Sequence, residues 1–388
     1  MRSIIFASIL GVTLGAGFAM AQPAADQDRP PVFRTEDATV KVVTVARGLE
    51  HPWAMAFLPD GRLLVTERPG RMRVVGKDGR VAPPLENLPP VFASGQGGLL
   101  DVTLDPDFAA NRMLYFTYAE PGDGPERGGA GTALASARFA GTRLEDVKVL
   151  FRQQPKLSGG LHFGSRVVVG PDDKLWLGLG ERYRRDEAQN LNVHLGKVIR
   201  LNKDGSVPAD NPFVGRNDAR PEIWSYGHRN IQGMARHPQT GPQSGRVWLH
   251  EHGARGGDEI NIPERGRNYG WPVITHGVDY SGAKIGIGSE APGMEQPLLH
   301  WTPSIAPSGM AFYGGSRIPA WRGNLFVGSL NSFLLMRVVL DGTRVVKQER
   351  LLAGLDERIR DVRDGPDGYL YIATDNADGR ILRIEPVN

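Results

Sequence analysis

Residues 159–180 read GGLHFGSRVVVGPDDKLWLGLG, and this stretch contains the pattern that predicts the fold. An apolar run at residues 167–169 follows His162, and the turn formers at residues 170–173 separate it from a second apolar run at 175–179. Two short runs of apolar and β-branched residues joined by such a turn are typical of a β-hairpin.

The same pattern occurs about six times along the chain, each copy with a strand, a turn rich in Pro, Gly and Asp, and a second strand. The copies start near Trp53, Leu99, His162, Gln232, Ser308 and Arg360. A further hairpin follows some copies, as at residues 71–82. Two hairpins per copy make about four strands, so repeats of roughly 50–75 residues predict an all-β fold, a six-bladed β-propeller with four-stranded antiparallel blades.

A pair of β-sandwiches is the rival architecture, but it would not explain one motif repeated in register. The uneven spacing indicates insertions, the longest of them between Trp271 and Ser304. No stretch keeps a 3.6-residue period for long, so we expect no long helices.

The first residues resemble a secretory signal. Arg2 precedes the apolar residues 4–12, and a small-x-small cleavage site at residues 19–21 follows. The alternative is a membrane anchor, but glycines interrupt the run, which is shorter than the roughly 20 residues of a span. We therefore predict a signal peptide at residues 1–21, a flexible leader at 22–39, a single propeller domain at 40–388, and no membrane span.

The composition bears on the cellular compartment of the protein and on its binding partners. The chain has no cysteine, which for an exported protein favours a bacterial periplasm over a disulfide-rich extracellular setting. With 46 Lys and Arg against 43 Asp and Glu, the net charge of +3 does not indicate nucleic-acid binding. The basic run of Arg182, Arg184 and Arg185 is interpreted as a solvated loop.

Polar residues stand at the same point of several copies, at or just before the first strand. Because equivalent points of propeller blades lie on one face around the central channel, we expect them to converge on one mouth. They are Gln96, His162, Arg229, Asn230, Ser304, Arg358 and Arg360.

This set predicts a site for an anion beside a base. Arg229, Arg358 and Arg360 offer forked donors that suit carboxylates, and they would repel one another unless a polyanion lay among them. His162 is the natural proton acceptor near neutral pH. No Gly-rich phosphate loop and no pattern of a covalent nucleophile with its base is present.

A second cluster spans residues 252–261 and 268–272 and combines glycines with acidic residues. Glycines let backbone carbonyls approach a ligand closely, and Asp258 and Glu259 supply carboxylate oxygens. Such oxygens suit Ca²⁺ rather than zinc. A rigid glycine-rich loop without a metal is the alternative.

In their order, several motifs resemble the glucose/sorbosone dehydrogenase family, soluble periplasmic aldose sugar dehydrogenases that use pyrroloquinoline quinone (PQQ). The resemblance covers nearly all of the chain after the predicted signal. Its marks are GQGGLL at 95–100, His162 with Ser165 and Arg166, GKVIRLN at 196–202, GHRN at 227–230, DEIN at 258–261, NYGWP at 268–272, APS at 306–308 and RIRD at 358–361.

The resemblance implies PQQ over the mouth of a six-bladed propeller, with His162 as general base. The quinone-binding positions it implies are Gln96, Arg229, Asn230, Ser304, Asn331, Arg358 and Arg360, with Tyr280 covering the quinone. Carbonyls of Gly253 and Ala254 would bind the Ca²⁺ that polarises the quinone, and Glu259 and Tyr269 would form a further calcium site. Gln96 and Asp258 are expected to contact the substrate.

Three positions depart from the glucose enzyme of this family. Leu161 takes the place of an acid just before the base, Asn331 that of a lysine near the cofactor, and His252 that of a glutamine. These departures bear on the choice of substrate and on the strength of quinone binding.

The resemblance implies an enzyme that oxidises the anomeric carbon of an aldose to a lactone. His162 would remove the hydroxyl proton, the hydride would pass to PQQ, Arg229 and Ca²⁺ would stabilise the developing charge, and an external acceptor would take the electrons. A calcium-dependent propeller lactonase or hydrolase is an alternative, and a non-catalytic binding propeller is another.

Overall fold

The computed structural model describes residues 30–238 and 245–387. Residues 31–388 form one compact unit, and the other unit, residues 1–30, lies almost wholly outside the described residues. The predicted signal peptide and residues 22–29 of the predicted leader therefore lie outside the described part.

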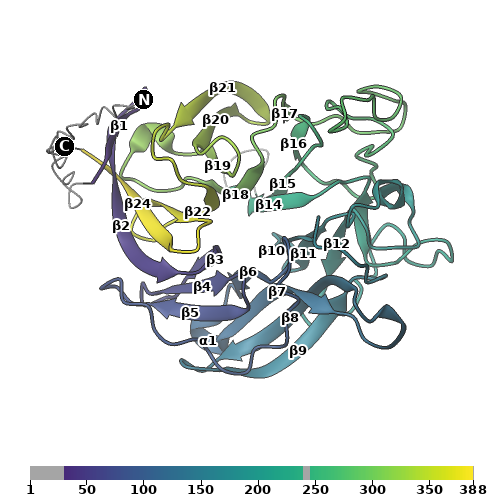
Figure 1. Cartoon of the computed structure of the whole chain (residues 1–388), viewed down its shortest axis with the longest axis horizontal. Helices are drawn as coiled ribbons and strands as arrows, with labels where there is room; N and C mark the ends of the chain where they lie inside the picture. Colours follow the sequence, from purple (N-terminus) through teal and green to yellow (C-terminus); the bar gives the residue numbers. More distant parts are fainter. Residues whose placement is uncertain (1–29, 239–244, 388) are drawn as a thin grey trace, which may run out of the picture. The chain divides into compact units, whose positions relative to one another are not determined.

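Six antiparallel sheets follow one another along the chain (Figure 1). The first has β3 (Pro52–Phe57), β4 (Leu63–Glu67) and β5 (Arg71–Val75); the second has β6 (Leu99–Leu104), β7 (Met113–Pro121), β8 (Ala130–Phe139) and β9 (Leu144–Arg152). The third has β10 (Gly164–Val169), β11 (Leu175–Leu179), β12 (Lys197–Leu201) and β13 (Ile223–Tyr226).

The fourth sheet has β14 (Ile231–Arg236), β15 (Val247–Glu251), β16 (Asp258–Asn261) and β17 (Leu299–Trp301), and the fifth has β18 (Pro307–Phe312), β19 (Leu325–Ser329), β20 (Leu335–Asp341) and β21 (Arg344–Leu351). The sixth joins β22 (Ile359–Asp364), β23 (Leu370–Thr374) and β24 (Gly379–Pro386) to β2 (Thr39–Leu49) and β1 (Val32–Arg34).

The first strand of each sheet lies on the inside of a closed ring. Strand β3 contacts β6, β6 contacts β10, and the series continues through β14, β18 and β22 back to β3. The ring closes within the sixth sheet, where β2 pairs with β24 along its length. The six-bladed β-propeller is therefore confirmed, although the first blade has three named strands and the sixth has five.

The predicted leader is wrong in its last part. Val32–Arg34 forms β1, which pairs with the start of β2, and residues 39–49 then continue the sixth sheet. Backbone hydrogen bonds to β2 order this segment, a contribution that its polar, proline-bearing composition does not reveal.

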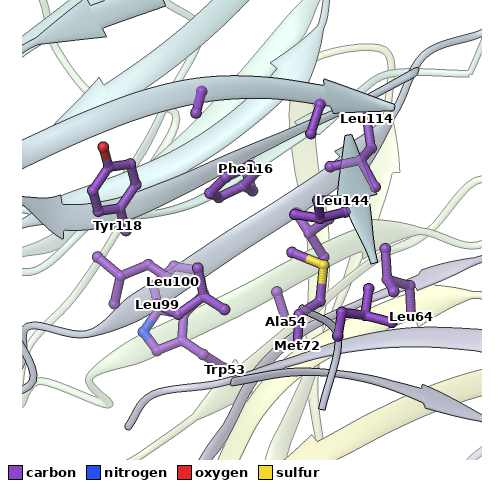
Figure 2. Close-up of a cluster of buried hydrophobic side chains, with 14 of the residues drawn as sticks. Trp53, Ala54, Leu64, Met72, Leu99, Leu100, Leu114, Phe116, Tyr118 and Leu144 are labelled. Atoms are coloured by element: carbon purple, nitrogen blue, oxygen red, sulfur yellow. The ribbon is translucent and has the colours of Figure 1, made fainter. Parts of the chain in front are cut away.

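Six hydrophobic clusters lie between neighbouring blades. The cluster of the first two blades joins Trp53 and Met72 to Leu100 and Phe116 (Figure 2), and similar clusters fill the other five interfaces. Neighbouring blades cover both faces of each sheet, so a strand such as Leu175–Leu179 is buried along its whole length. Burial between blades thus holds a chain without disulfides.

Every inner strand begins with an irregularity in its pairing with the second strand of its blade. The register shifts at Pro52/Ala54, Leu99/Val102, Gly164/Val167, Ile231/Gly233, Pro307/Met310 and Ile359/Asp361. Bulges of this kind bend a strand and redirect its side chains, and they are common beside active sites.

Helices are short, as expected. In the part of the chain that the structure describes they are α1 (Phe108–Asn111), η1 (Gly124–Glu126), η2 (Arg185–Gln189) and η3 (Pro319–Trp321). Across the described residues, no helix has the length and apolar character needed to cross a bilayer.

Candidate active site

Five of the seven polar residues predicted at the start of the inner strands line one cavity of ≈ 790 Å³, and His162 and Arg229 are not among its lining residues. Nine of the predicted site residues line it: Gln96, Asn230, Gly253, Ala254, Tyr280, Ser304, Asn331, Arg358 and Arg360. They come from four blades and from the insertion, so closure of the ring brings together residues as far apart as 96 and 360. A mouth built from equivalent points of the blades is what the repeat predicted.

The cavity wall is rich in arginine. Arg68, Arg358 and Arg360 line it together with one carboxylate, Asp375, which accepts hydrogen bonds from Arg360 at 3.2 Å and Arg358 at 3.4 Å. His51 contacts the other oxygen of Asp375 at 2.8 Å. Burial alone would raise the pKa of Asp375, but the surrounding cations outweigh burial and hold the pKa well below its usual value. One carboxylate against four guanidinium groups, since Arg255 also lines the cavity, leaves an excess of positive charge.

A buried ionic network beneath the cavity fixes the inner strands. Arg166 on β10 contacts Asp101 on β6 at 3.0 Å and Asp361 on β22 at 2.9 Å. Its other nitrogens donate to the backbone carbonyls of Gln232 at 2.8 Å and Arg360 at 3.3 Å. Four blades are joined at this point, so the backbone that carries Arg360 cannot shift alone.

His162 lies beside this cavity, 5% exposed, next to the lining residues Phe163 and Gly164. Its Nδ1 is 2.6 Å from Oε2 of Glu181, and its backbone N–H donates to Oε1 of Gln96 at 2.8 Å. A carboxylate at Nδ1 selects the tautomer in which Nε2 is free to accept a proton. Burial lowers the pKa of His162, as does Arg229, and Glu181 opposes them. The imidazole is therefore neutral at neutral pH.

Arg229 lies between this cavity and a second one of ≈ 520 Å³ that it lines. Its guanidinium donates to the carbonyls of His252, at 3.1 Å, and Gly253, and to the hydroxyl of Tyr280 at 3.3 Å. The cation also lies 5.2 Å from the ring centre of Trp271. These contacts aim one fixed positive charge at the boundary between the cavities.

Glu181 and Tyr183 also line the second cavity, and Ala254 and Tyr280 line both. Tyr280 is 59% exposed, which suits a side chain that covers a ligand from the inserted loop. His162 thus has the two cavities as neighbours, the first through Phe163 and Gly164 and the second through its partner Glu181.

Two of the residues that differ from the glucose enzyme, His252 and Asn331, also line the cavity. His252 lies 2.6 Å from the carbonyl of Pro307 through Nε2, so that nitrogen donates. Burial lowers the pKa of His252 to about 3, and Arg229 adds to this effect. The ring is therefore neutral and can act like an amide. Leu161 is 42% exposed and adds no charge beside the base.

The residues predicted to bind calcium offer two kinds of oxygen donor, backbone carbonyls at residues 253–254 and a carboxylate at Glu259. Gly253 and Ala254 line the cavity, and a Cβ at Gly253 would collide with the carbonyls of Gly256 and Gly257, so the tight turn requires glycine there. Backbone carbonyls on a cavity wall suit a hard cation that a polyanionic ligand also binds. In this structure the Gly253 carbonyl accepts from Arg229. The carbonyls of this turn are of the donor type that suits calcium.

Glu259 fits a cation in a different way. It lies across from Glu251 in the β15–β16 pair, and both residues line a small pocket of ≈ 10 Å³ with Tyr269. Burial and the Glu251 charge raise the pKa of Glu259 to about 8, and Oδ1 of the neighbouring Asn261 is buried without a partner among the described residues. A cation bound here would offset the repulsion between Glu251 and Glu259 and could be bound by the Asn261 oxygen.

The hydroxyl of Tyr269 bonds elsewhere. It donates to the Ile262 carbonyl at 2.5 Å and accepts from the Glu264 backbone N–H at 3.0 Å, so only its backbone carbonyl is available for a metal. No cluster of three or more His, Cys, Asp or Glu suited to a metal occurs within residues 30–238 and 245–387.

The prediction that Asp258 contacts substrate is wrong. Its carboxylate is fully buried and accepts from the backbone N–H groups of Gly253 at 2.9 Å, Ile305 at 2.8 Å and Ala306 at 3.1 Å. The Ser304 hydroxyl donates to it at 2.7 Å. These hydrogen bonds lower the pKa of Asp258, but burial outweighs them and raises it. Asp258 therefore ties the turn at Gly253 to the 304–306 segment instead of facing the cavity.

Sequence reasoning missed the residues that end the second strands. Glu181 follows β11, Asp375 follows β23 and Arg68 follows β4; His252, which the sequence did single out, follows β15 in the same way. A usable signal existed, because an antiparallel second strand returns to the face where the first strand began. The interpretation of Arg182 as solvated is also wrong, since it is buried, at 3% exposed.

This arrangement of base, arginines and carbonyl turn has known relatives. The family model for Glucose / Sorbosone dehydrogenase matches residues 49–383. The chain belongs to the glucose/sorbosone dehydrogenase family. Members of this family are sugar dehydrogenases, and the chain is an oxidoreductase of that kind.

Three relatives place the chain within the glucose/sorbosone dehydrogenase family. The aldose sugar dehydrogenase YliI of Escherichia coli is 47% identical over 90% of this chain and 94% of its own length. A glucose dehydrogenase crystal structure is 52% identical, with a TM-score of 0.85 over 88% of this chain and 99% of that one. The PQQ-bound aldose sugar dehydrogenase of Streptomyces coelicolor is 30% identical, with a TM-score of 0.74 over 92% and 99%.

Proposed function

We propose that the protein is a PQQ-dependent aldose sugar dehydrogenase that uses Ca²⁺ and converts aldoses to lactones. The observation that carries the proposal is the cavity in which Arg68, Arg358 and Arg360 face one carboxylate, Asp375, beside the His162–Glu181 pair. PQQ carries three carboxylates, which balance this positive charge, and a cavity of ≈ 790 Å³ is within the range of cofactor sites.

When bound, PQQ supplies a carbonyl that accepts the hydride from the anomeric carbon, and Ca²⁺ polarises that carbonyl. His162 accepts the proton of the anomeric hydroxyl at Nε2 while Glu181 holds Nδ1. A positioned base of this kind contributes roughly 10²–10⁴-fold in rate.

Arg229 contributes a fixed charge where negative charge develops. Its guanidinium is held by the carbonyls of His252 and Gly253, and its backbone N–H donates to Glu251 at 2.5 Å. Such preorganised stabilisation is worth roughly 3–4 kcal/mol. Loss of the hydride from C1 and the proton from O1 leaves the lactone, and an external acceptor takes the two electrons.

We further propose that the mature enzyme works in the periplasm, on the strength of the signal-like residues 1–21 and the absence of cysteine. A hydrolase is less well supported, because the described cavity wall presents arginines where a lactone-hydrolysing calcium centre would need several acidic ligands.

The test is reconstitution of the purified protein with PQQ and Ca²⁺, followed by dye reduction with a panel of aldoses. We expect activity that requires both additions and formation of the aldonolactone. Quinone titration that shows no binding would refute the proposal. Lactone cleavage by the quinone-free protein with Ca²⁺ would favour the hydrolase instead.

A further inference from the structure

Arg182 is a buried cation whose role no part of the proposed reaction explains. It follows Glu181 directly, beyond the end of β11, and is 3% exposed. Among residues 30–238 and 245–387 it makes no salt bridge, although buried arginines are usually paired with a carboxylate. Burial lowers its pKa to about 10, so it remains charged at neutral pH.

Backbone carbonyls take the place of a carboxylate around Arg182. Its guanidinium donates to the carbonyls of Gly159, at 2.7 Å, of Leu157, at 3.2 Å, and of Leu161. The cation also lies 3.7 Å from the ring centre of Phe163. One side chain thus binds three carbonyls of the loop between β9 and β10 and the aromatic ring at its end.

The same loop carries His162. The histidine has a left-handed φ of 52°, which a non-glycine residue adopts only when its surroundings hold it there. Its carbonyl accepts from the Arg182 backbone N–H at 3.2 Å. Residues 153–163 form no strand beyond one bridge at Leu157, so their carbonyls depend on partners from elsewhere.

We propose that Arg182 is a positioning residue for His162, whose guanidinium gathers the carbonyls of residues 157–161 and thereby fixes the imidazole against Glu181 and the cavity. Glu181 orients the ring, and its sequence neighbour Arg182 holds the backbone beneath it. The catalytic part of this inference rests on the proposed function, whereas the structural part does not.

An arginine suits this role better than a lysine. A planar guanidinium offers five donors in a fixed fork and can stack on a ring, whereas an ammonium is a compact point charge. A lysine would keep the charge near His162 but lose most of the carbonyl bonds. The two effects of Arg182, charge and loop anchoring, can therefore be separated.

The charged and titratable groups around His162 determine the expected signature. They are Glu181 at Nδ1, Arg182 behind the loop, Arg229 and His252 across the cavity, and Tyr183, whose ring centre is 5.3 Å away. Burial and the two arginines lower the pKa of His162. Removing Arg182 takes away one positive charge and admits water, and both changes raise that pKa.

The experiment compares Arg182→Met with Arg337→Met in the quinone-free protein. Arg337 is the control, a buried guanidinium of the fifth blade that bonds to the Ala320 carbonyl and lies 5.9 Å from the Trp321 ring centre. Unlike Arg182, it also pairs with Asp37 and Glu349. The His162 imidazole is titrated by nitrogen NMR, with its signal assigned by its loss in His162→Gln, and amide hydrogen exchange is followed over residues 157–163.

In Arg182→Met we expect the His162 titration midpoint to rise by about one unit and exchange in the loop to accelerate about tenfold or more. Arg337→Met should lower the unfolding temperature and leave both readouts unchanged. A wild-type midpoint and wild-type exchange in Arg182→Met would overturn the inference.

If Arg182→Met does not fold, Arg182→Lys decides the matter. We expect faster loop exchange with a smaller rise in the midpoint, because the charge is retained. Wild-type exchange in that variant would overturn the inference. Neither readout needs quinone or sugar, so a failure of the proposed function would leave the test of Arg182 intact.

Discussion

Oε2 of Glu181 lies 2.6 Å from Nδ1 of His162 and also accepts the backbone N–H of Tyr183 at 2.7 Å. The backbone N–H of a residue two positions along the chain therefore fixes the carboxylate that binds the imidazole. The third blade thus holds the imidazole through Glu181, while Gln96 of the second blade binds the backbone of His162.

Replacement of Glu181 by Gln should lower turnover of the reconstituted enzyme about 10–100-fold, because the ring loses the partner that selects its tautomer. Glu181 raises the pKa of His162 against burial. Its removal lowers that pKa further, so the acidic limb of the kcat/KM profile should move to lower pH by about one unit. A limb that moves to higher pH, or wild-type turnover, would contradict the assignment.

His162→Ala should bind PQQ normally and lose about 10²–10⁴-fold in turnover, because only the proton acceptor is removed. The matched control is His194→Ala. His194 is a buried histidine whose Nε2 lies 2.5 Å from Glu222, and it lines a different cavity. Quinone titration and steady-state rates measure the two properties separately. Near-normal rates in His162→Ala would rule out its role as base.

Asp375→Asn should lower the free energy of unfolding by about 3 kcal/mol at pH 7, since it leaves the buried Arg360 without its carboxylate partner. The pKa of Asp375 is held well below its usual value in the folded protein. Its stabilisation is therefore present above the unfolded pKa, about 3.9, and is lost as pH falls below it.

Urea unfolding at pH 7 and pH 3 measures this difference. The gap between wild type and Asp375→Asn should be smaller at pH 3, where the unfolded carboxyl is protonated. Asp279→Asn, on the exposed inserted loop, serves as control and should have little effect. An equal gap at both pH values would show that Asp375 acts through packing alone.

Calcium should raise the unfolding temperature of the wild type and have little effect on Glu259→Gln. Saturation at 100 times Kd corresponds to about 2.7 kcal/mol. Without calcium the variant should be at least as stable as wild type, because the repulsion from Glu251 that helps to raise the pKa of Glu259 is gone. Differential scanning calorimetry with and without chelator measures both effects.

Glu264→Gln is the control for calcium, since Glu264 is exposed and lies near Tyr269. It should keep the calcium response of the wild type. A full response in Glu259→Gln would place the ion elsewhere, at the carbonyl turn of Gly253 and Ala254.

The repeat in the sequence was sufficient to predict the ring and its mouth. The strand at Leu175–Leu179 and its counterparts in the other blades lie where the alternating pattern placed them, because that pattern is local and is read from neighbouring residues. The position of His162 before β10 followed from the same register.

Two acidic residues show where such reasoning stops. The family resemblance implied that Asp258 contacts the substrate, yet its carboxylate is buried and accepts four hydrogen bonds, three of them from residues 304–306. Asp375 was passed over because nothing near it in the chain indicates that two arginines, 15 and 17 residues earlier, converge on its carboxylate.

By itself, the sequence determined the six repeats, the strands within them and the offset at which the base and the arginines occur. Only the tertiary structure decided which charges meet, namely that Asp375 neutralises part of the arginine cluster, that Glu181 holds His162, and that Arg182 is buried under the loop that carries the base. The physical reason is the separation along the chain of the residues on which each property depends. A strand pattern depends on residues a few positions apart, whereas burial and pairing of charge depend on segments that become neighbours only when the ring closes.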